Sequence, residues 1–358
     1  MNNNTIYLAV TVAFMIGLAI IGIMISRGVK SSEDWMVAGK SLGKIPMAGT
    51  YFATIVSATS IMSYMGYYYL NGWPGWWNAA GTLMTSFLAC IYFARKVRQS
   101  ECNTLPEFIE KRYSRAFSIP ASLLVVLCCT ALLANQVTGA VILLQSFVDW
   151  STITCCVILL LVFIVFTCIG GMKAVAWTDT VCALVIIVGV WIIAGEFLFR
   201  VGGFTAMNEG IAAVDPEFVQ GFSVSIPPMT ALSWVITWGI CNFGAPQFVA
   251  RFMSAESPEV ASKSQGITGI GLLLFYVPLA IIGLCGILIH PGIEKQDAVF
   301  TTLIMSEVSP LMGAVMLAAV VAAIISTADS LLLLVATTFT HDFYCKVKSN
   351  VTDKEELL

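Results

Sequence analysis

Residues 317–334 read LAAVVAAIISTADSLLLL, a stretch long and apolar enough to belong to a membrane helix. Ser326, Thr327 and Asp329 interrupt it near its middle. A charged side chain at the bilayer centre costs roughly 2.5–3.5 kcal/mol on insertion scales, so such residues usually face a cavity or a partner. Small alanines nearby let another backbone approach closely. Hydroxyl oxygens in such a place suit a dehydrated cation, although bonding back to the preceding helical turn explains Ser and Thr equally well.

The composition places the chain in a membrane. Of its 358 residues, 58% are hydrophobic and 11% are charged, whereas soluble globular chains carry about 25% charged residues. Nearly all of the 11 cysteines lie in apolar runs, where Cys behaves as a small hydrophobe. The absence of CxxC pairs and of Cys/His ligand spacing argues against metal and disulfide frameworks. The first apolar run lacks a basic start and a cleavage site, so we interpret it as a retained helix.

About 20 apolar residues span a bilayer, and the sequence predicts nine spans. They are residues 5–26, 45–70, 76–93, 116–147, 152–168, 177–199, 229–248, 266–289 and 311–340. Of the 18 Lys and Arg residues, all but Arg200 and Lys295 fall on one side of these segments. Because basic residues collect in cytoplasmic loops, we expect a multi-pass protein of the plasma or inner membrane, with its N-terminus outside and its C-terminus in the cytoplasm.

The connections between the spans differ in kind. Residues 103–113 predict a short amphipathic cytoplasmic helix, with Thr104 as its N-cap and Pro106 in its first turn. Residues 201–228 are rich in Gly, Pro and acidic residues and predict a long external loop. Tryptophans in residues 71–77 are typical of the outer membrane interface.

Two predicted spans carry polar or helix-breaking residues at bilayer depth. Residues 51–60, YFATIVSATS, contain four hydroxyl groups. Broken helices free carbonyls that hold sodium near the midplane in transporters, but no Gly or Pro marks a break here. In the seventh span, Gly239, Gly244 and Pro246 lie within about two helical turns. They predict unwinding around a cavity, with a simple proline kink as the alternative.

Three motifs resemble the sodium:solute symporter family, which includes sodium/proline, sodium/pantothenate and sodium/sugar symporters. They are GGMKAVAWTDTV at 170–181, the stretch 238–255 that ends in ARFMSA, and AAIIST at 322–327. TLPEF at 104–108 and HDFY at 341–344 also look like family landmarks. The resemblance implies an all-α polytopic membrane protein with a LeuT-type fold of two inverted five-helix repeats.

The resemblance also implies a sodium site between the second and ninth spans. Its ligands would be the backbone carbonyls of Ala53, Val56 and Ala323 and the side-chain oxygens of Ser326 and Thr327. Asp179 matches the family's acidic residue on the inner sodium path, although an Asp near a helix start could instead complement the helix dipole. Asp329 is not required by the motif and receives no predicted role.

Solute contacts are expected on the second, fourth and seventh spans. The candidates are Ser57, Asn135, Gln136, Trp238, Asn242 and Pro246, which could bind a small polar or carboxylate-bearing solute. The polar ones could equally be interhelical hydrogen-bonding groups worth about 0.6 kcal/mol each. Ile55 and Asn242 differ from the acidic and aromatic residues of the proline-transporting branch, so the resemblance does not identify the solute as proline.

We expect one transmembrane domain over residues 1–358. Residues 1–44 would be an extra N-terminal helix and loop, 45–200 the first repeat, 201–228 an external loop, 229–345 a partial second repeat, and 346–358 a charged cytoplasmic tail. Family members continue through at least two more core helices. The resemblance therefore implies an incomplete second repeat and a C-terminally truncated chain.

The predicted function is sodium-coupled symport of a small organic solute, such as an amino acid, a carboxylate or a pantothenate-like compound, into the cell. Sodium is the expected coupling ion and the bilayer the expected environment, without a cofactor, nucleic acid or obligatory oligomer. A non-transporting fragment or a membrane sensor domain of the same family is the alternative. An enzyme is not expected, because His290 and His341 are predicted to lie in loops on opposite faces, away from any embedded Asp/Ser set.

Overall fold

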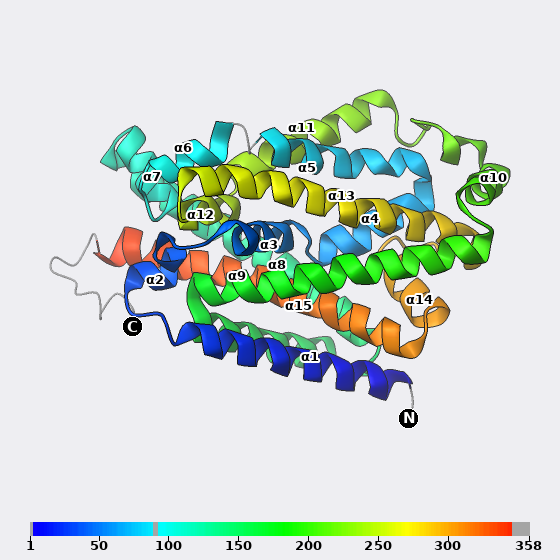
Figure 1. The fold of residues 1–358 in the computed structure, drawn as a ribbon, viewed down its shortest axis with the longest axis horizontal. Helices are drawn as coiled ribbons and strands as arrows, with labels where there is room; N and C mark the ends of the chain where they lie inside the picture. Colours follow the sequence, from blue (N-terminus) through cyan, green and yellow to red (C-terminus); the bar gives the residue numbers. More distant parts are fainter. Residues whose placement is uncertain (1–2, 89–91, 346–358) are drawn as a thin grey trace.

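The computed structural model describes residues 3–88 and 92–345, and this part of the chain is built from helices. Long helices lie side by side, and the described chain begins at one end of the bundle and finishes at the other (Figure 1). The one β-type contact among these residues is an isolated parallel bridge between Leu42 and Ala255. The predicted all-α class is therefore confirmed.

The helical elements follow the predicted spans closely and add several short helices between them. In chain order they are α1 (Asn3–Ser26), α2 (Ser32–Val37), η1 (Ala38–Lys40), α3 (Lys44–Ile55), α4 (Ala58–Asn71), η2 (Trp73–Trp76), α5 (Trp77–Leu88), α6 (Ala94–Gln99), α7 (Leu105–Arg112), η4 (Arg115–Phe117), α8 (Ser118–Gln145), α9 (Thr152–Val201), α10 (Phe204–Val214), η5 (Pro216–Val219), α11 (Pro228–Gly244), α12 (Pro246–Ser254), α13 (Pro258–Ile289), α14 (Ala298–Glu307), α15 (Pro310–Thr337) and η6 (Thr338–Tyr344).

Five of the described helical stretches are long and apolar enough to cross a membrane, and the bent pair of α3 and α4 would make a sixth. The five are Asn3–Ser26, Arg115–Gln145, Gly171–Val201, Pro258–Ile289 and Pro310–Tyr344. The other predicted spans correspond to shorter helices: α5, α11 and the first arm of α9. The molecule is thus a multi-pass membrane protein, and the number of nine spans stays a prediction.

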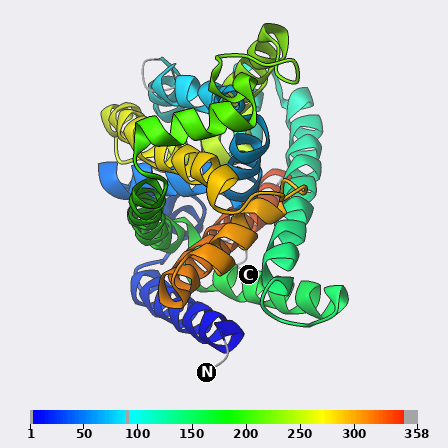
Figure 2. The ribbon, with the colours of Figure 1, turned by 90° about the vertical axis from the view of Figure 1, so that its right-hand side faces the viewer.

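Helix α15 lies at the centre of the bundle. Figure 2 shows it between α1, α9 and α8 when the bundle is viewed end on, and these three helices all pack against it. Twenty of its 28 residues are buried, including the alanines at 318, 319, 322 and 323. Because these alanines occupy little space, neighbouring backbones come close to α15 on several sides.

A kink divides α9 into two arms at Gly171. This residue has φ +54° and ψ −172°, a conformation that L-residues with a Cβ rarely adopt. A Cβ at this position would also lie only 2.8 Å from Trp35 Cδ1 and 2.9 Å from Trp35 O. The short helix α2 therefore docks through Trp35 on the kink, eight residues before Asp179.

Helix α2 is held by a capping box. Its N-cap Ser31 accepts a hydrogen bond from Asp34 N (3.0 Å), and Asp34 Oδ2 accepts from Ser31 N (3.2 Å) and from Lys30 N (3.0 Å). The hydrogen bond from the Lys30 N–H, followed by those from Ser31, holds the pKa of the Asp34 carboxyl below its usual value. The carboxylate form thus stabilises the start of this helix.

We expect Ser31→Ala and Asp34→Asn each to loosen α2 by about 1 kcal/mol, the usual cost of losing an N-cap partner. The measurement is the hydrogen-exchange protection of the α2 amides. Because the pKa of Asp34 is depressed in the folded chain, its contribution is present at neutral pH and is lost as the pH falls through that pKa. Equal protection in Asp34→Asn and wild type at neutral pH would contradict this role.

The connections at the two ends of the bundle confirm one prediction and correct another. The predicted helix at 103–113 is present as α7, with Thr104 Oγ1 accepting from Glu107 N at 3.2 Å. The predicted external loop at 201–228 instead contains α10 and η5, and Trp73 Nε1 donates to Asn208 Oδ1 of α10 at 2.7 Å. This hydrogen bond from a partly buried indole anchors a helical segment that composition alone suggested was irregular.

Candidate site at the helix break

The second predicted span is broken at its centre. Helix α3 ends at Ile55 and α4 begins at Ala58, and the two arms meet at an angle of 57°. Val56 has φ −84° and ψ 79°, so its carbonyl leaves the helical direction, and Ser57 is extended at φ −101° and ψ −178°. The break lies without Gly or Pro in a buried position, where irregular backbone is tolerated because protein surrounds it.

Helix α15 passes beside this break and contributes its hydroxyl groups there. Thr327 Oγ1 lies 3.3 Å from the carbonyl oxygen of Ala53 and 2.9 Å from that of Ala323. All three residues are at most 5% exposed. The structure therefore brings together Ala53, Ala323 and Thr327 from parts of the chain about 270 residues apart, with Val56 three residues further along at the break.

Ser326 makes a different contact from its neighbour Thr327. Its hydroxyl donates to Asp179 Oδ1, and Thr50 Oγ1 donates to Asp179 Oδ2 at 2.6 Å. Ser326 is 6% exposed, and both Asp179 and Thr50 are fully buried. A serine that donates its proton to a carboxylate keeps its lone pairs for a cation, so the contact is compatible with the predicted ligand role.

Sequence reasoning missed two members of this cluster, Thr50 and Arg251. Arg251 was counted among the basic residues on the cytoplasmic side, yet it is 0% exposed and its Nη2 lies 3.8 Å from Asp179 Oδ2. The available signal was its place inside the ARFMSA motif, directly after a predicted break. A basic residue counted for topology can be buried in protein when a carboxylate is nearby.

The seventh predicted span is also broken, as its Gly and Pro residues indicated. Helix α11 ends at Gly244, Ala245 is extended at φ −67° and ψ 130°, and Pro246 starts α12. Trp238 is half-buried on α11, and the neighbouring Gly239 carbonyl accepts from Thr85 Oγ1 at 2.6 Å. The side chain of Asn242 lies outside the described part of the structure.

The two polar residues of α8 that are candidates for binding the solute do not lie on the same face of the helix. Gln136 is buried, and its Oε1 has no hydrogen-bond partner among the described residues, whereas Asn135 is exposed. Consecutive helical residues point about 100° apart, so the two side chains diverge. Ser57 is buried at the α3–α4 break. Gln136 is therefore the better supported of the α8 candidates.

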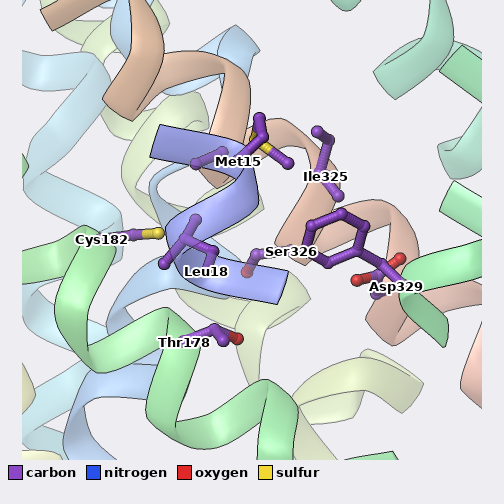
Figure 3. Close-up of a pocket in the computed structure, with 9 residues that line it drawn as sticks. Met15, Leu18, Thr178, Cys182, Ile325, Ser326 and Asp329 are labelled. Atoms are coloured by element: carbon purple, nitrogen blue, oxygen red, sulfur yellow. The ribbon is translucent and has the colours of Figure 1, made fainter. Parts of the chain in front are cut away.

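A small cavity adjoins Ser326 on the side of the N-terminal helix. Figure 3 shows Thr178 and Cys182 of α9 and Ser326 and Asp329 of α15 around it, with Met15 and Leu18 of α1. Asp329 is 4% exposed and accepts a hydrogen bond from Thr167 Oγ1 at 3.0 Å. The residue without a predicted role thus lies beside the cluster, but it belongs to a different hydrogen-bonding group.

This arrangement consists of neutral carbonyl and hydroxyl oxygens in a buried place, with the Asp179 carboxylate and the Arg251 guanidinium beside them. The described residues contain no group of three or more His, Cys, Asp or Glu side chains suited to a metal ion. A discontinuous helix that frees backbone carbonyls inside a helical bundle is the usual place of ion binding in secondary transporters. The fold and the site together define a membrane transporter.

Comparisons with known proteins show to which family of transporters this chain is similar. The model of the sodium:solute symporter family matches residues 35–358. The sodium/proline symporter of Salmonella typhimurium is 26% identical over 364 residues, covering 96% of this chain and 72% of that protein. The sodium/proline symporter of Haemophilus influenzae is 27% identical over the same length and coverage. A substrate-bound, outward-open structure of a Na+-coupled sialic acid symporter matches with a TM-score of 0.84 and 19% identity, covering 98% of this chain and 76% of that one.

The chain belongs to the sodium:solute symporter family. The structural match confirms the predicted LeuT-type fold. Family membership makes the protein a sodium-coupled symporter of a small solute rather than an enzyme, with sodium as its coupling ion.

Proposed function

We propose that the chain imports a small amino acid or carboxylate-bearing solute with sodium, and that sodium binds between the α3–α4 break and α15. The observation that carries this proposal is the position of Thr327 Oγ1 beside the carbonyls of Ala53 and Ala323. With Val56 and Ser326 these residues would supply five oxygens without side-chain charge, which suits weak, reversible binding of a monovalent cation.

Asp179 would lie on the inner route of the ion, because its carboxylate accepts from Ser326 and because α2 docks on its helix at Gly171, at the end of the bundle that holds α2 and α7 (Figure 1). We place that end in the cytoplasm, from the distribution of Lys and Arg. The N-terminus would then be outside and the C-terminus inside, and the bilayer would be the required environment. No cofactor other than sodium and no oligomer is needed for this arrangement.

The solute would bind next to the sodium, between the two broken spans and α8. Ser57, Gln136, Trp238 and Pro246 come from these elements. The Ser57 hydroxyl and Gln136 Oε1, which has no hydrogen-bond partner within the described ranges, are suited to a polar solute. Asn135 and Asn242 remain further candidates. The named relatives include sodium/proline symporters and a sialic acid symporter, both of which handle carboxylate-bearing solutes.

Sodium would provide the driving force. One positive charge crossing about 100 mV gains roughly 2.3 kcal/mol, and each ~1.4 kcal/mol corresponds to a factor of ten. The potential alone could therefore concentrate the solute on the order of fifty-fold per net charge moved. Coupling requires that sodium and solute favour the same conformation, which sodium would do by holding α3 against α15.

Uptake into proteoliposomes tests this function. The purified chain is reconstituted into lipid vesicles, a sodium gradient is imposed across their membrane, and uptake of radiolabelled proline, sialic acid and pantothenate is measured. We expect uptake of at least one carboxylate-bearing solute, with Thr327→Ala raising the sodium concentration for half-maximal uptake at least about tenfold, equivalent to ~1.4 kcal/mol. Ser326→Ala should shift it in the same direction.

Thr337→Ala is the matched control. This threonine is also buried on α15, but its hydroxyl bonds only to the carbonyls of Leu333 and Leu334 among the described residues. It should leave the sodium dependence unchanged. An unaltered sodium dependence in Thr327→Ala would defeat the proposed site, and failure to transport any solute of the panel would favour a non-transporting protein of the same family.

A further inference from the structure

The buried cluster next to the proposed sodium site contains a positively charged side chain, the guanidinium of Arg251. Arg251 on α12 is fully buried, and among the described residues Asp179 is its one ion-pair partner, with Nη2 and Oδ2 3.8 Å apart. A buried charge is costly unless a counter-charge or several hydrogen bonds compensate it. The position of Arg251 therefore depends on this carboxylate and on the surrounding acceptors.

The hydrogen bonds of Arg251 go to neutral groups. Its Nε donates to Thr50 O and Oγ1, each at 3.1 Å, its Nη1 to Gln247 O at 2.7 Å, and its Nη2 to Ser330 Oγ at 2.6 Å. Charge-assisted hydrogen bonds between nitrogen and a carboxylate are usually about 2.7–2.9 Å long. At 3.8 Å the guanidinium attracts Asp179 without holding it in a direct hydrogen bond.

The two oxygens of Asp179 face different partners. Oδ1 accepts from Ser326, a proposed sodium ligand, and Oδ2 accepts from Thr50 and faces Arg251. Thr50 precedes Ala53 by about one turn of α3, and Ser330 follows Ser326 by about one turn of α15, with Ser330 Oγ donating to Ser326 O at 2.9 Å. One carboxylate thus stands between the sodium site and the guanidinium.

We propose that Arg251 is a tethered cation that competes with sodium for the negative charge of Asp179. The proposal rests on the sodium site proposed above. Two positive charges close to one carboxylate repel each other strongly in a buried, weakly screened place. Arg251 therefore weakens sodium binding, and it neutralises Asp179 after the ion has left. In this way it sets the sodium affinity and favours release of the ion.

Direct sodium binding tests this competition without requiring transport. Binding of ²²Na⁺ to the purified full-length chain is measured for wild type, Arg251→Gln and Arg251→Lys. We expect Arg251→Gln to bind sodium about tenfold more tightly than wild type, because the repulsion is removed while Asp179 stays, and the charge-conserving Arg251→Lys to remain near wild type. If Arg251 only supports the fold, its loss should leave sodium binding unchanged or weaken it. Equal or weaker binding by Arg251→Gln therefore overturns the proposal.

A second comparison keeps the test decisive if Arg251→Gln does not fold with an unpaired buried carboxylate. The variant Asp179→Asn/Arg251→Gln carries neither charge and is compared with Asp179→Asn alone. We expect the double variant to bind sodium about tenfold more tightly than the single one, and no gain overturns the proposal. Absence of saturable binding in wild type would instead overturn the sodium site itself, so the two failures are distinguishable.

Discussion

Asp179→Asn is expected to reduce sodium affinity about a hundredfold or more and to destabilise the fold. The substitution removes the charge that faces Ser326 and leaves Arg251 buried without its carboxylate partner. Breaking a buried ion pair by removing one partner usually costs about 3–5 kcal/mol. The measurements are ²²Na⁺ binding and thermal unfolding of the purified protein.

The control for this variant is Asp179→Asn/Arg251→Gln. Removing both charges should restore much of the lost stability, because no unpaired buried charge remains, and neighbouring groups of this kind are not additive. Sodium affinity should also recover in part. If Asp179→Asn unfolds at the wild-type temperature and binds sodium as wild type does, the buried cluster has no role in either property.

Gly49→Ala should have the second large effect, because Gly49 lies where α3 crosses α9. A Cβ at this position would meet Thr180 Oγ1 and would lie 2.8 Å from Thr180 Cα, a backbone atom that cannot move alone. Overpacking of this kind usually costs about 1–3 kcal/mol. Separation of the helices would also stretch the adjacent Thr50–Asp179 hydrogen bond of 2.6 Å, so we expect sodium affinity to fall at least about tenfold, or ~1.4 kcal/mol.

Gly195→Ala is the matched substitution on α9, since a Cβ there meets nothing within 4 Å. Alanine favours a helix over glycine by about 1 kcal/mol, so this variant should be as stable as wild type or more so. Thermal unfolding and sodium binding are compared for the two variants. Equal behaviour of Gly49→Ala and Gly195→Ala would show that the α3–α9 crossing is not tightly packed.

Hydrophobic patterning predicted most of the helices, because a helix that lies in lipid needs a run of about 20 apolar residues, which is easily seen in the sequence. The α11–α12 break was also predictable, since Gly244 and Pro246 disfavour a continuous helix. The break at Val56 and Ser57 was not, because neither residue is a helix breaker. Its non-helical backbone is compatible with tertiary packing against α15, which local sequence does not record.

Some residues of the candidate site could likewise be predicted from the sequence, and others could not. Ser326 and Thr327 were recognisable as hydroxyls in an apolar span, but only the packing shows that one contacts Asp179 and the other Ala53. The place of Arg251 in the ARFMSA motif was visible in the sequence, but its burial was not, because a basic residue near the end of a predicted span is ordinarily solvated. Thr50 carried no signal that set it apart from the other hydroxyl residues of its span. Arg251 is buried next to the carboxylate of Asp179, which comes from a distant helix, and this pairing is what makes Arg251 part of the site.

Equilibrium binding of ²²Na⁺ to the purified chain, with Thr327→Ala and Thr337→Ala beside wild type, tests the sodium site most directly. We predict saturable binding in wild type and in Thr337→Ala, displaced by unlabelled sodium but not by potassium, and at least about tenfold weaker binding in Thr327→Ala, or ~1.4 kcal/mol. Saturable binding that Thr327→Ala leaves unchanged would contradict a site between Ala53 and α15.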